Sequence, residues 1–386
     1  MPIYLDYHAT TPVDPRVAEK VMVVMTTQFG NASSVDHGVG DRSREAVEQA
    51  KKQIADLVNC RPKEIIFTSG ATESINLAIQ GTVLHHEKQG EIPRIAISAV
   101  EHKAVLDTCH ALEKQGRIEL ITLPVDAQAN LNLNDIEKIC RQGLDLLCIM
   151  AANNEVGTIY PIELIGAIAK RYKIPFLCDA SQAVGKIPIN FTDWGITLLA
   201  LSGHKLYAPQ GIGALIHNTD HPLEPILFGG GQQQGLRPGT LNLPGIVGLG
   251  EACHLRQLEM VEDEKAIAAK RDTLQTQLTQ AIPEIVVNGN QFQRLAGNLH
   301  IAIPNIPNSA IIAHIRNQIA ISTGSACSSG TVTLSHVLRA MSLPDLLMDG
   351  ALRIGIGKFT TNSEILESSN LLITAIKQIK EISTKV

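Results

Sequence analysis

Thr197-Leu198-Leu199-Ala200-Leu201-Ser202-Gly203-His204-Lys205 is a short apolar run that ends abruptly in polar residues. Such a run predicts a strand that is buried on both faces of a sheet. A second run, Ile174-Pro175-Phe176-Leu177-Cys178, is closed by Asp179 in the same way. In open α/β sheets, ligands bind beside the carboxyl ends of the strands, so we expect these polar residues to line a site.

Strand-like runs and helical patterns alternate on both sides of this stretch. Residues 42–58 place apolar side chains on one helical face, and helices are also predicted from about Thr72 and from His102. Further apolar runs lie at 64–68, 94–99, 145–151 and 212–216. This alternation predicts an α/β fold with a mostly parallel sheet that helices cover on both faces.

Lys205 and Asp179 together indicate pyridoxal 5'-phosphate chemistry. An amine holds a pyridoxal aldehyde as a Schiff base, and the ring nitrogen draws electrons only while a carboxylate keeps it protonated. Lys205 would supply the amine and Asp179 the carboxylate. Either residue alone is more often a surface charge, so the prediction depends on finding further parts of a cofactor site.

A phosphate site is predicted where the run 64–68 continues into Ser69-Gly70-Ala71-Thr72. Gly70 turns the chain into a helix, and the free N–H groups and positive dipole of a helix start suit an anion. Ser202 and His204, close to the proposed lysine, add further donors. The alternative is an ordinary cap at Ser69, although the Glu or Gln of a strict capping box is missing there.

Further motifs extend along nearly the whole chain. They are Tyr4-Leu5-Asp6-Tyr7-His8-Ala9-Thr10-Thr11-Pro12, Phe29-Gly30-Asn31, Thr68 to Glu73, Glu101-His102-Lys103, Asn153-Asn154-Glu155 with Gly157, Asp179-Ala180-Ser181-Gln182, Ser202 to Lys205, Arg237-Pro238-Gly239-Thr240 and Ser325-Ala326-Cys327. In order and spacing they resemble the group I cysteine desulfurases of the nitrogen-fixation and iron-sulfur-assembly type. These enzymes belong to the class V aminotransferase group and have a PLP-dependent transferase fold.

The resemblance implies a role for each matching residue. His102 would stack on the cofactor ring, Gln182 would hydrogen-bond the ring hydroxyl, and Asn154 would lie beside ring and substrate. Thr240 would reach the phosphate of the other subunit, which implies a homodimer. The implied cofactor-binding set is Ala71, Thr72, His102, Asn154, Asp179, Gln182, Ser202, His204, Lys205 and Thr240.

Cys327 separates desulfuration from amino transfer. It lies among small and glycyl residues without apolar periodicity, in Ile321-Ser322-Thr323-Gly324-Ser325-Ala326-Cys327-Ser328-Ser329-Gly330. The resemblance implies that its thiolate takes sulfur from L-cysteine as a persulfide and leaves alanine, with Lys205 and His102 as further catalytic residues. The implied substrate-binding residues are Asn31, Asn154 and Arg353. An iron-sulfur scaffold or a sulfur-carrier protein would then accept the sulfur.

We expect two domains. Residues 13–254 would form a large cofactor-binding domain, while 1–12 and 255–386 would form a smaller α+β domain that carries Cys327. In the second part, 255–280 has a charged helical pattern, strands are predicted near 296–303 and 316–322, and a helix closes the chain.

Global properties narrow the class of protein. A net charge of −5 without a long basic run gives no basis for nucleic-acid binding. Seven cysteines without a Cys-x-x-Cys pair argue against a disulfide framework or a zinc site, and no metal is expected. No apolar run approaches a membrane span and the start does not resemble a signal peptide, so we expect a cytoplasmic protein.

Alternative activities can be compared with the same residues. An aminotransferase or lyase of this fold would need Lys205 and Asp179 but not Cys327, and a selenocysteine lyase would differ in substrate. A nicotinamide dehydrogenase lacks support because no Gly-x-Gly-x-x-Gly occurs, and no nucleotide phosphate loop is present. Ala32 and Ala151-Ala152 depart from common family residues, which leaves details of the substrate pocket open.

Overall fold

The computed structural model describes residues 2–323 and 334–383. Its main sheet has seven strands in the order β2-β8-β7-β6-β5-β3-β4. They are β2 (Ile65–Thr68), β3 (Arg94–Ser98), β4 (Glu119–Leu123), β5 (Leu146–Cys148), β6 (Phe176–Asp179), β7 (Leu198–Ser202) and β8 (Gly213–His217). β8 is antiparallel to both of its neighbours, and every other adjacent pair is parallel. The predicted mostly parallel sheet is confirmed.

Helices cover both faces of this sheet, because its strands are apolar on both sides. Along β7, Leu199 and Leu201 pack into one hydrophobic cluster, while Leu198 and Ala200 pack into another. The helices of this body are α1 (Pro15–Thr26), α2 (Gly38–Val58), α3 (Ala71–Lys88), α4 (Lys103–Lys114), α5 (Leu133–Arg141), α6 (Ile162–Tyr172) and α7 (Leu243–Ala281). The first cluster includes residues of α2, α5, α6 and α7, and the second includes residues of α3 and α4. The predicted α/β layering is therefore confirmed.

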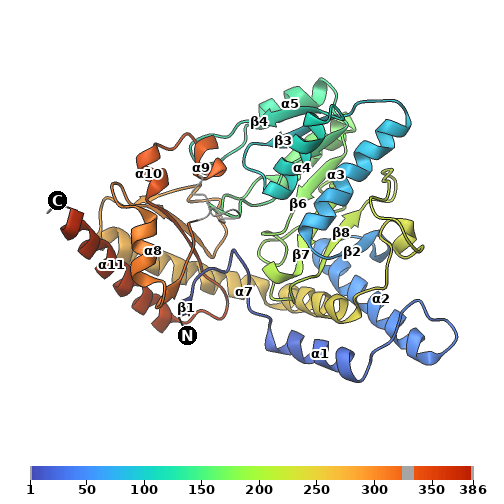
Figure 1. The fold of residues 1–386 in the computed structure, drawn as a ribbon, viewed down its shortest axis with the longest axis horizontal. Helices are drawn as coiled ribbons and strands as arrows, with labels where there is room; N and C mark the ends of the chain where they lie inside the picture. Colours follow the sequence, from blue (N-terminus) through green and yellow to red (C-terminus); the bar gives the residue numbers. More distant parts are fainter. Residues whose placement is uncertain (1, 324–333, 384–386) are drawn as a thin grey trace.

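The long helix α7 connects the two parts of the molecule and runs from beneath the main sheet to the smaller body (Figure 1). It begins at Leu243, well before the charged helix predicted from Leu255. Its first turns are buried on most sides and therefore lack a charged face. At Gly250 the helix lies so close to α2 that a Cβ would come within 2.6 Å of Ala50 Cα. None of the helices in the described part of the chain is both long and apolar enough to cross a membrane.

The smaller body is built around an antiparallel sheet in the order β12-β10-β9. Its elements are β9 (Val286–Val287), β10 (Asn298–Ala302), α8 (Asn308–Ile315), α9 (His336–Ala340), α10 (Asp345–Asp349), β12 (Ala351–Gly355) and α11 (Asn362–Ser383). The N-terminal strand β1 (Ile3–Tyr4) pairs with β11 (Ile319–Ala320). Leu5 packs into the hydrophobic cluster of this body. The start of the chain thus lies against its C-terminal part, while the domain boundaries given above remain a prediction.

Candidate active site

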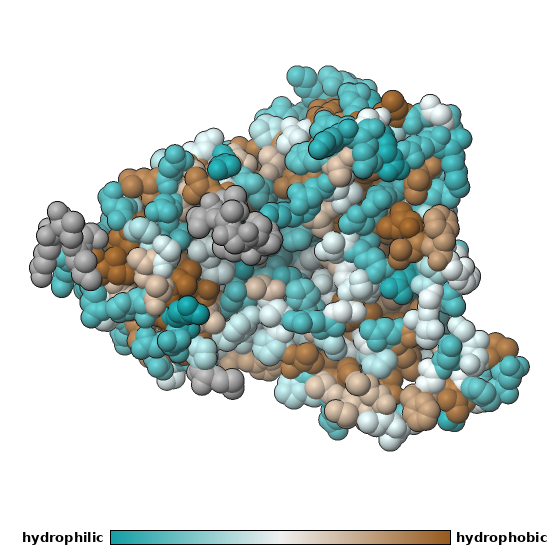
Figure 2. All heavy atoms as spheres, viewed as in Figure 1, coloured by the Kyte–Doolittle hydropathy of each residue, from teal (hydrophilic) through white to brown (hydrophobic). Residues whose placement is uncertain are grey.

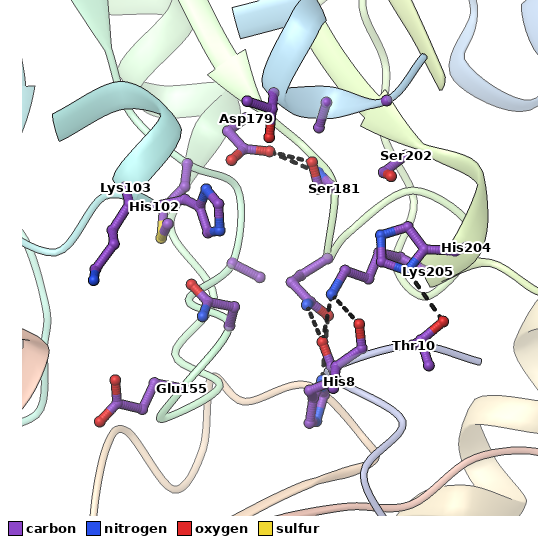
Figure 3. A pocket seen from close by; sticks show the side chains of 18 of the residues that line it. His8, Thr10, His102, Lys103, Glu155, Asp179, Ser181, Ser202, His204 and Lys205 are labelled. Carbon is purple, nitrogen blue, oxygen red and sulfur yellow. Dashed lines mark hydrogen bonds between the residues drawn. The ribbon is translucent and has the colours of Figure 1, made fainter. Parts of the chain in front are cut away.

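A cavity of about 940 Å³ lies beside the carboxyl ends of β6 and β7 and is also lined by residues of the smaller body. Figure 2 shows the surface hollowed between the two bodies, and Figure 3 shows His8 and Thr10 of the N-terminal segment facing Lys205 and His204 there. The wall includes residues of the segments 8–10, 69–73, 102–103, 150–155, 179–182, 202–205 and 334–336, together with Arg353. Residues widely separated in the sequence therefore share one cavity.

Lys205 lines this cavity from the end of a short 3₁₀ turn, Gly203–Lys205, that directly follows β7. Its Nζ donates to the backbone carbonyls of His8 at 2.6 Å and Ala9 at 2.7 Å. Burial, together with the nearby positive charge of Arg353, lowers the pKa of Lys205 to about 8. A larger share of this amine is neutral near neutral pH than for an exposed lysine, which suits it to attack a carbonyl.

Asp179 ends β6 and is only 6% exposed. Its Oδ1 accepts from the backbone N–H of Ser181 at 3.0 Å and from the Ser181 hydroxyl at 2.5 Å. Oδ2 has no hydrogen-bond partner among the described residues. The carboxylate therefore has a fixed orientation and one oxygen left for a ligand at the cavity wall (Figure 3).

The start of α3 provides the predicted anion site. Gly70 is the capping residue, with φ +156°, and no side chain caps the helix. The backbone N–H of Ser69 instead donates to Glu73 Oε2 at 2.7 Å, so an ordinary serine cap at Ser69 is wrong. Residues 69–73 line the cavity. The uncapped N–H groups of this helix are thus positioned for a negatively charged ligand.

His102, Ser202 and His204 also line the cavity, as predicted for residues of one site. His102 caps α4, because its Nδ1 accepts from the N–H of Ala104 at 3.1 Å and leaves Nε2 available. His204 Nδ1 lies 3.1 Å from Thr10 Oγ1. Burial and the neighbouring lysine lower the pKa of His204 to about 4, so its ring is neutral at pH 7.

The remaining predicted residues divide into two groups. Asn154, Gln182 and Arg353 line the cavity with the residues above. The Arg353 guanidinium donates to Asn154 O at 3.1 Å and to Asp6 Oδ1 at 2.9 Å, while its buried Nε has no partner among the described residues. Asn31 and Thr240 are not among the cavity-lining residues. The roles assigned to all of these residues stay predictions.

The sequence of this chain matches one known protein family over most of its length. The family model for class-V aminotransferases matches residues 3–367. The chain belongs to the class-V aminotransferase family. The match includes both bodies of the structure and all the cavity-lining segments.

Several similar proteins carry the name cysteine desulfurase. This family member is 40% identical over 385 residues to "Cysteine desulfurase IscS" of Anaeromyxobacter sp. (strain Fw109-5), which covers 99% of this chain and 94% of the relative. It is 42% identical over 386 residues to "Cysteine desulfurase IscS" of Ehrlichia chaffeensis, with 99% and 93% covered. Among solved structures, a "NIFS-LIKE PROTEIN" superposes with a TM-score of 0.89 at 33% identity over 100% of both chains. "SspA in complex with cysteine" superposes with a TM-score of 0.79 at 33% identity, over 93% of this chain and 100% of that one.

The described cysteines of this class-V family member lack the position and the low pKa expected of a catalytic nucleophile. The six described cysteines are free, and none of them lines the cavity. Burial raises the pKa of every one of them, for example to about 12 for Cys60 and Cys109. Cys327 lies outside the described residues. The described residues on either side of its segment reach the cavity, since Ser322 pairs with Arg353 and Leu334 lies in the wall.

The sequence predicted no role for several residues of the site. His8 and Ala9 hold Lys205 through backbone carbonyls, which leave no signature in a sequence; only their motif pointed to them. Glu155 is 2% exposed in the cavity wall, and burial raises its pKa to about 7. His336 Nε2 lies 3.0 Å from Glu101 O. Among residues 2–323 and 334–383, no group of three or more His, Cys, Asp or Glu could hold a metal ion.

Proposed function

We infer that this protein is a cysteine desulfurase, which removes sulfur from L-cysteine with pyridoxal 5'-phosphate and leaves alanine and a persulfide on Cys327. One observation carries this conclusion. A half-buried lysine with a lowered pKa, a carboxylate and an uncapped helix start share a single cavity. The named relatives, about 40% identical over nearly the whole chain, support the same activity.

The described residues fit the cofactor part by part. The uncapped start of α3, with Ser202 beside Gly70, suits a phosphate, because N–H and O–H donors converge there. Asp179 has a free oxygen for a protonated ring nitrogen, and Lys205 has the amine for an aldehyde. When bound, the pyridine ring would supply the electron sink that weakens bonds at the substrate α-carbon.

The protein's own groups then handle the substrate. Lys205 moves a proton at the substrate α-carbon, since its lowered pKa lets the amine both accept and release a proton near neutral pH. Arg353 binds the substrate carboxylate with its planar guanidinium. His102 presents Nε2 to the cavity and assists proton transfer.

Cys327 carries out the sulfur transfer. Its thiolate attacks the substrate sulfur, so that an S–S bond forms while the bond between sulfur and the β-carbon breaks. The carbon product then takes up a proton and leaves as alanine. The described residues that flank the segment of Cys327 support this role, because Leu334 lines the cavity and Ser322 pairs with the cavity-lining Arg353.

Replacing Cys327 by Ala tests this assignment. We expect Cys327→Ala to keep the visible absorption of the bound cofactor and to lose sulfide release from L-cysteine, since only the acceptor thiol is removed. Cys60→Ala is the matched control, because Cys60 lies outside the cavity and its thiol has a raised pKa. Sulfide release by Cys327→Ala at the wild-type rate would reject the assignment.

We further propose a homodimer in which Thr240 reaches the phosphate of the partner subunit's cofactor. The absence of Thr240 from the cavity wall of its own chain is consistent with this. Mixing inactive Thr240→Ala and Lys205→Ala proteins should restore part of the activity, because one of the two hybrid sites is intact. The sulfur acceptor would be an iron-sulfur scaffold or a sulfur-carrier protein, which transfer of labelled sulfur to candidate acceptors identifies.

A further inference from the structure

The side-chain amide of Gln182 is held at both ends. Its Nε2 donates to the backbone carbonyl of His8 at 2.9 Å, and its Oε1 accepts from Lys186 Nζ at 2.8 Å. His8 Nδ1 lies 3.2 Å from the same Oε1. A carbonyl can only accept, so turning the amide by half a rotation would set Oε1 against the carbonyl of His8. The orientation of Gln182 is therefore fixed by its neighbours.

This orientation leaves one amide N–H for a ligand. Nε2 carries two hydrogens, and among the described residues only the carbonyl of His8 accepts from it. Gln182 is 5% exposed and lines the cavity. A ligand atom that meets Nε2 must therefore be a hydrogen-bond acceptor, because the amide oxygen is turned away toward Lys186.

The two groups that hold Oε1 are themselves held in place. His8 is 3% exposed, and burial together with nearby cations keeps its pKa well below the usual range, so the neutral ring can donate from Nδ1. Burial lowers the pKa of Lys186 to about 7, against the attraction of Glu264, and an amine donates in either protonation state. Arg256 bonds both Glu264, at 3.1 Å, and Gly185 O, at 2.7 Å, which anchors the turn before Lys186.

We propose that Lys186 and His8 are positioning residues, which orient Gln182 so that it offers an N–H donor to an oxygen acceptor of the ligand. The inference rests on the proposed function, in which that acceptor is the oxygen on the cofactor ring. Neither residue needs to touch the ligand through its side chain. Both act through the amide of Gln182, and this makes their effect depend on Gln182 being present.

A double-mutant cycle tests this dependence with the equilibrium affinity of the apoprotein for pyridoxal 5'-phosphate as the readout. We expect Lys186→Met to weaken binding about tenfold, the loss typical of one hydrogen bond to a charged group. In a Gln182→Leu background the same change should alter affinity less than about twofold, since no amide remains to be oriented. Lys186→Arg, which restores a donor, should recover binding. The absorption maximum of the bound cofactor should shift in Lys186→Met but not in Lys186→Arg.

The controls separate positioning from folding. Lys138→Met, on the exposed face of α5, should bind as wild type. His8→Phe keeps the backbone carbonyl and ring volume but removes the donor, so it should repeat the loss seen for Lys186→Met. Equal losses for Lys186→Met in both backgrounds, or no loss in either, would overturn the inference while wild-type desulfuration stands. A wild-type protein that neither bound the cofactor nor released sulfide would instead overturn the proposed function, and this inference with it.

Discussion

At the scale of single residues, burial lowers the pKa of the Lys205 amine, which favours its attack on a carbonyl. With its pKa lowered to about 8, close to half of the amine is neutral at pH 8. For an ordinary lysine, with a pKa of about 10.4, the neutral share there is roughly a hundredfold smaller. The surroundings of Lys205 thus make its amine more nucleophilic near neutral pH than that of an exposed lysine.

Competitive labelling of the apoprotein with an acylating reagent checks this pKa. Only the neutral amine reacts, so labelling of Lys205 should rise as the pH is raised through about 8 and then level off. Mass spectrometry of the digest measures this residue against the exposed lysines. If labelling of Lys205 rose in parallel with theirs up to pH 10, the pKa would be ordinary and the amine a poor nucleophile at neutral pH.

At the scale of elements, helix α3 has a glycine with positive φ near each end. Only the glycine at its start lies at the cavity. Gly70 at its start has φ +156° beside the cavity, while Gly90, just past its end, has φ +77° with nothing within 4 Å of an added Cβ. Either backbone conformation is unfavourable for an L-residue. The two glycines therefore provide a matched pair for separating strain from anion binding.

We expect Gly70→Ala and Gly90→Ala each to lower the free energy of unfolding by about 1–3 kcal/mol, because both impose positive φ on alanine. Only Gly70→Ala should also weaken binding of the cofactor, since it alone alters the N–H groups that meet the phosphate. Urea unfolding and cofactor titration measure the two effects. Equal cofactor affinity in both variants would mean that the start of α3 is not the phosphate site.

At the scale of the whole molecule, an ionic cluster around a buried Asp14–Lys358 pair joins the N-terminal segment to the rest of the structure. Asp14, 2% exposed, pairs with Lys358 of the smaller body and with Arg16 at 2.9 Å. Arg16 also bonds Glu259 of α7 at 2.5 Å. These partners hold the pKa of Asp14 well below its usual range. The cluster therefore links the start of α1 and helix α7 to Lys358 of the smaller body.

Asp14→Asn should lower the free energy of unfolding by about 3 kcal/mol, because it removes the buried carboxylate beside the Lys358 ammonium and leaves, among the described residues, only the partly exposed Glu259, 3.5 Å away, to balance that charge. A carboxyl whose pKa is depressed by folding stabilises above its unfolded pKa, so the loss should be constant from pH 5 to 8 and shrink below about pH 4. Urea unfolding at several pH values measures it. Glu259→Gln, whose side chain is 31% exposed, should cost at most about 1 kcal/mol. Similar losses for both variants would contradict a buried link at Asp14.

Local pattern accounts for most of the main sheet. The apolar runs at 64–68, 94–99, 145–151, 174–178, 197–201 and 212–216 each overlap a strand of that sheet, and the bounds differ by one to three residues at an end. The exception is β4, an edge strand at Glu119–Leu123, in which the exposed residues Glu119 and Thr122 interrupt the apolar ones, so that no apolar run forms. The start of α7 was missed for the opposite reason, since its burial removes the charged face that marks a helix.

The sequence by itself determined which residues end buried strands and which chemistry they offer, because burial and backbone preference are properties of short segments. Lys205, Asp179 and the glycine turn at 70 could be recognised on that basis. Only the tertiary structure decided which atoms meet them. The carbonyls that hold Lys205 are 197 and 196 residues away in the chain, and the orientation of Gln182 depends on His8 from the N-terminal segment. Such contacts arise from chain packing, since a backbone carbonyl has the same chemistry in every residue and acquires a role only through its position.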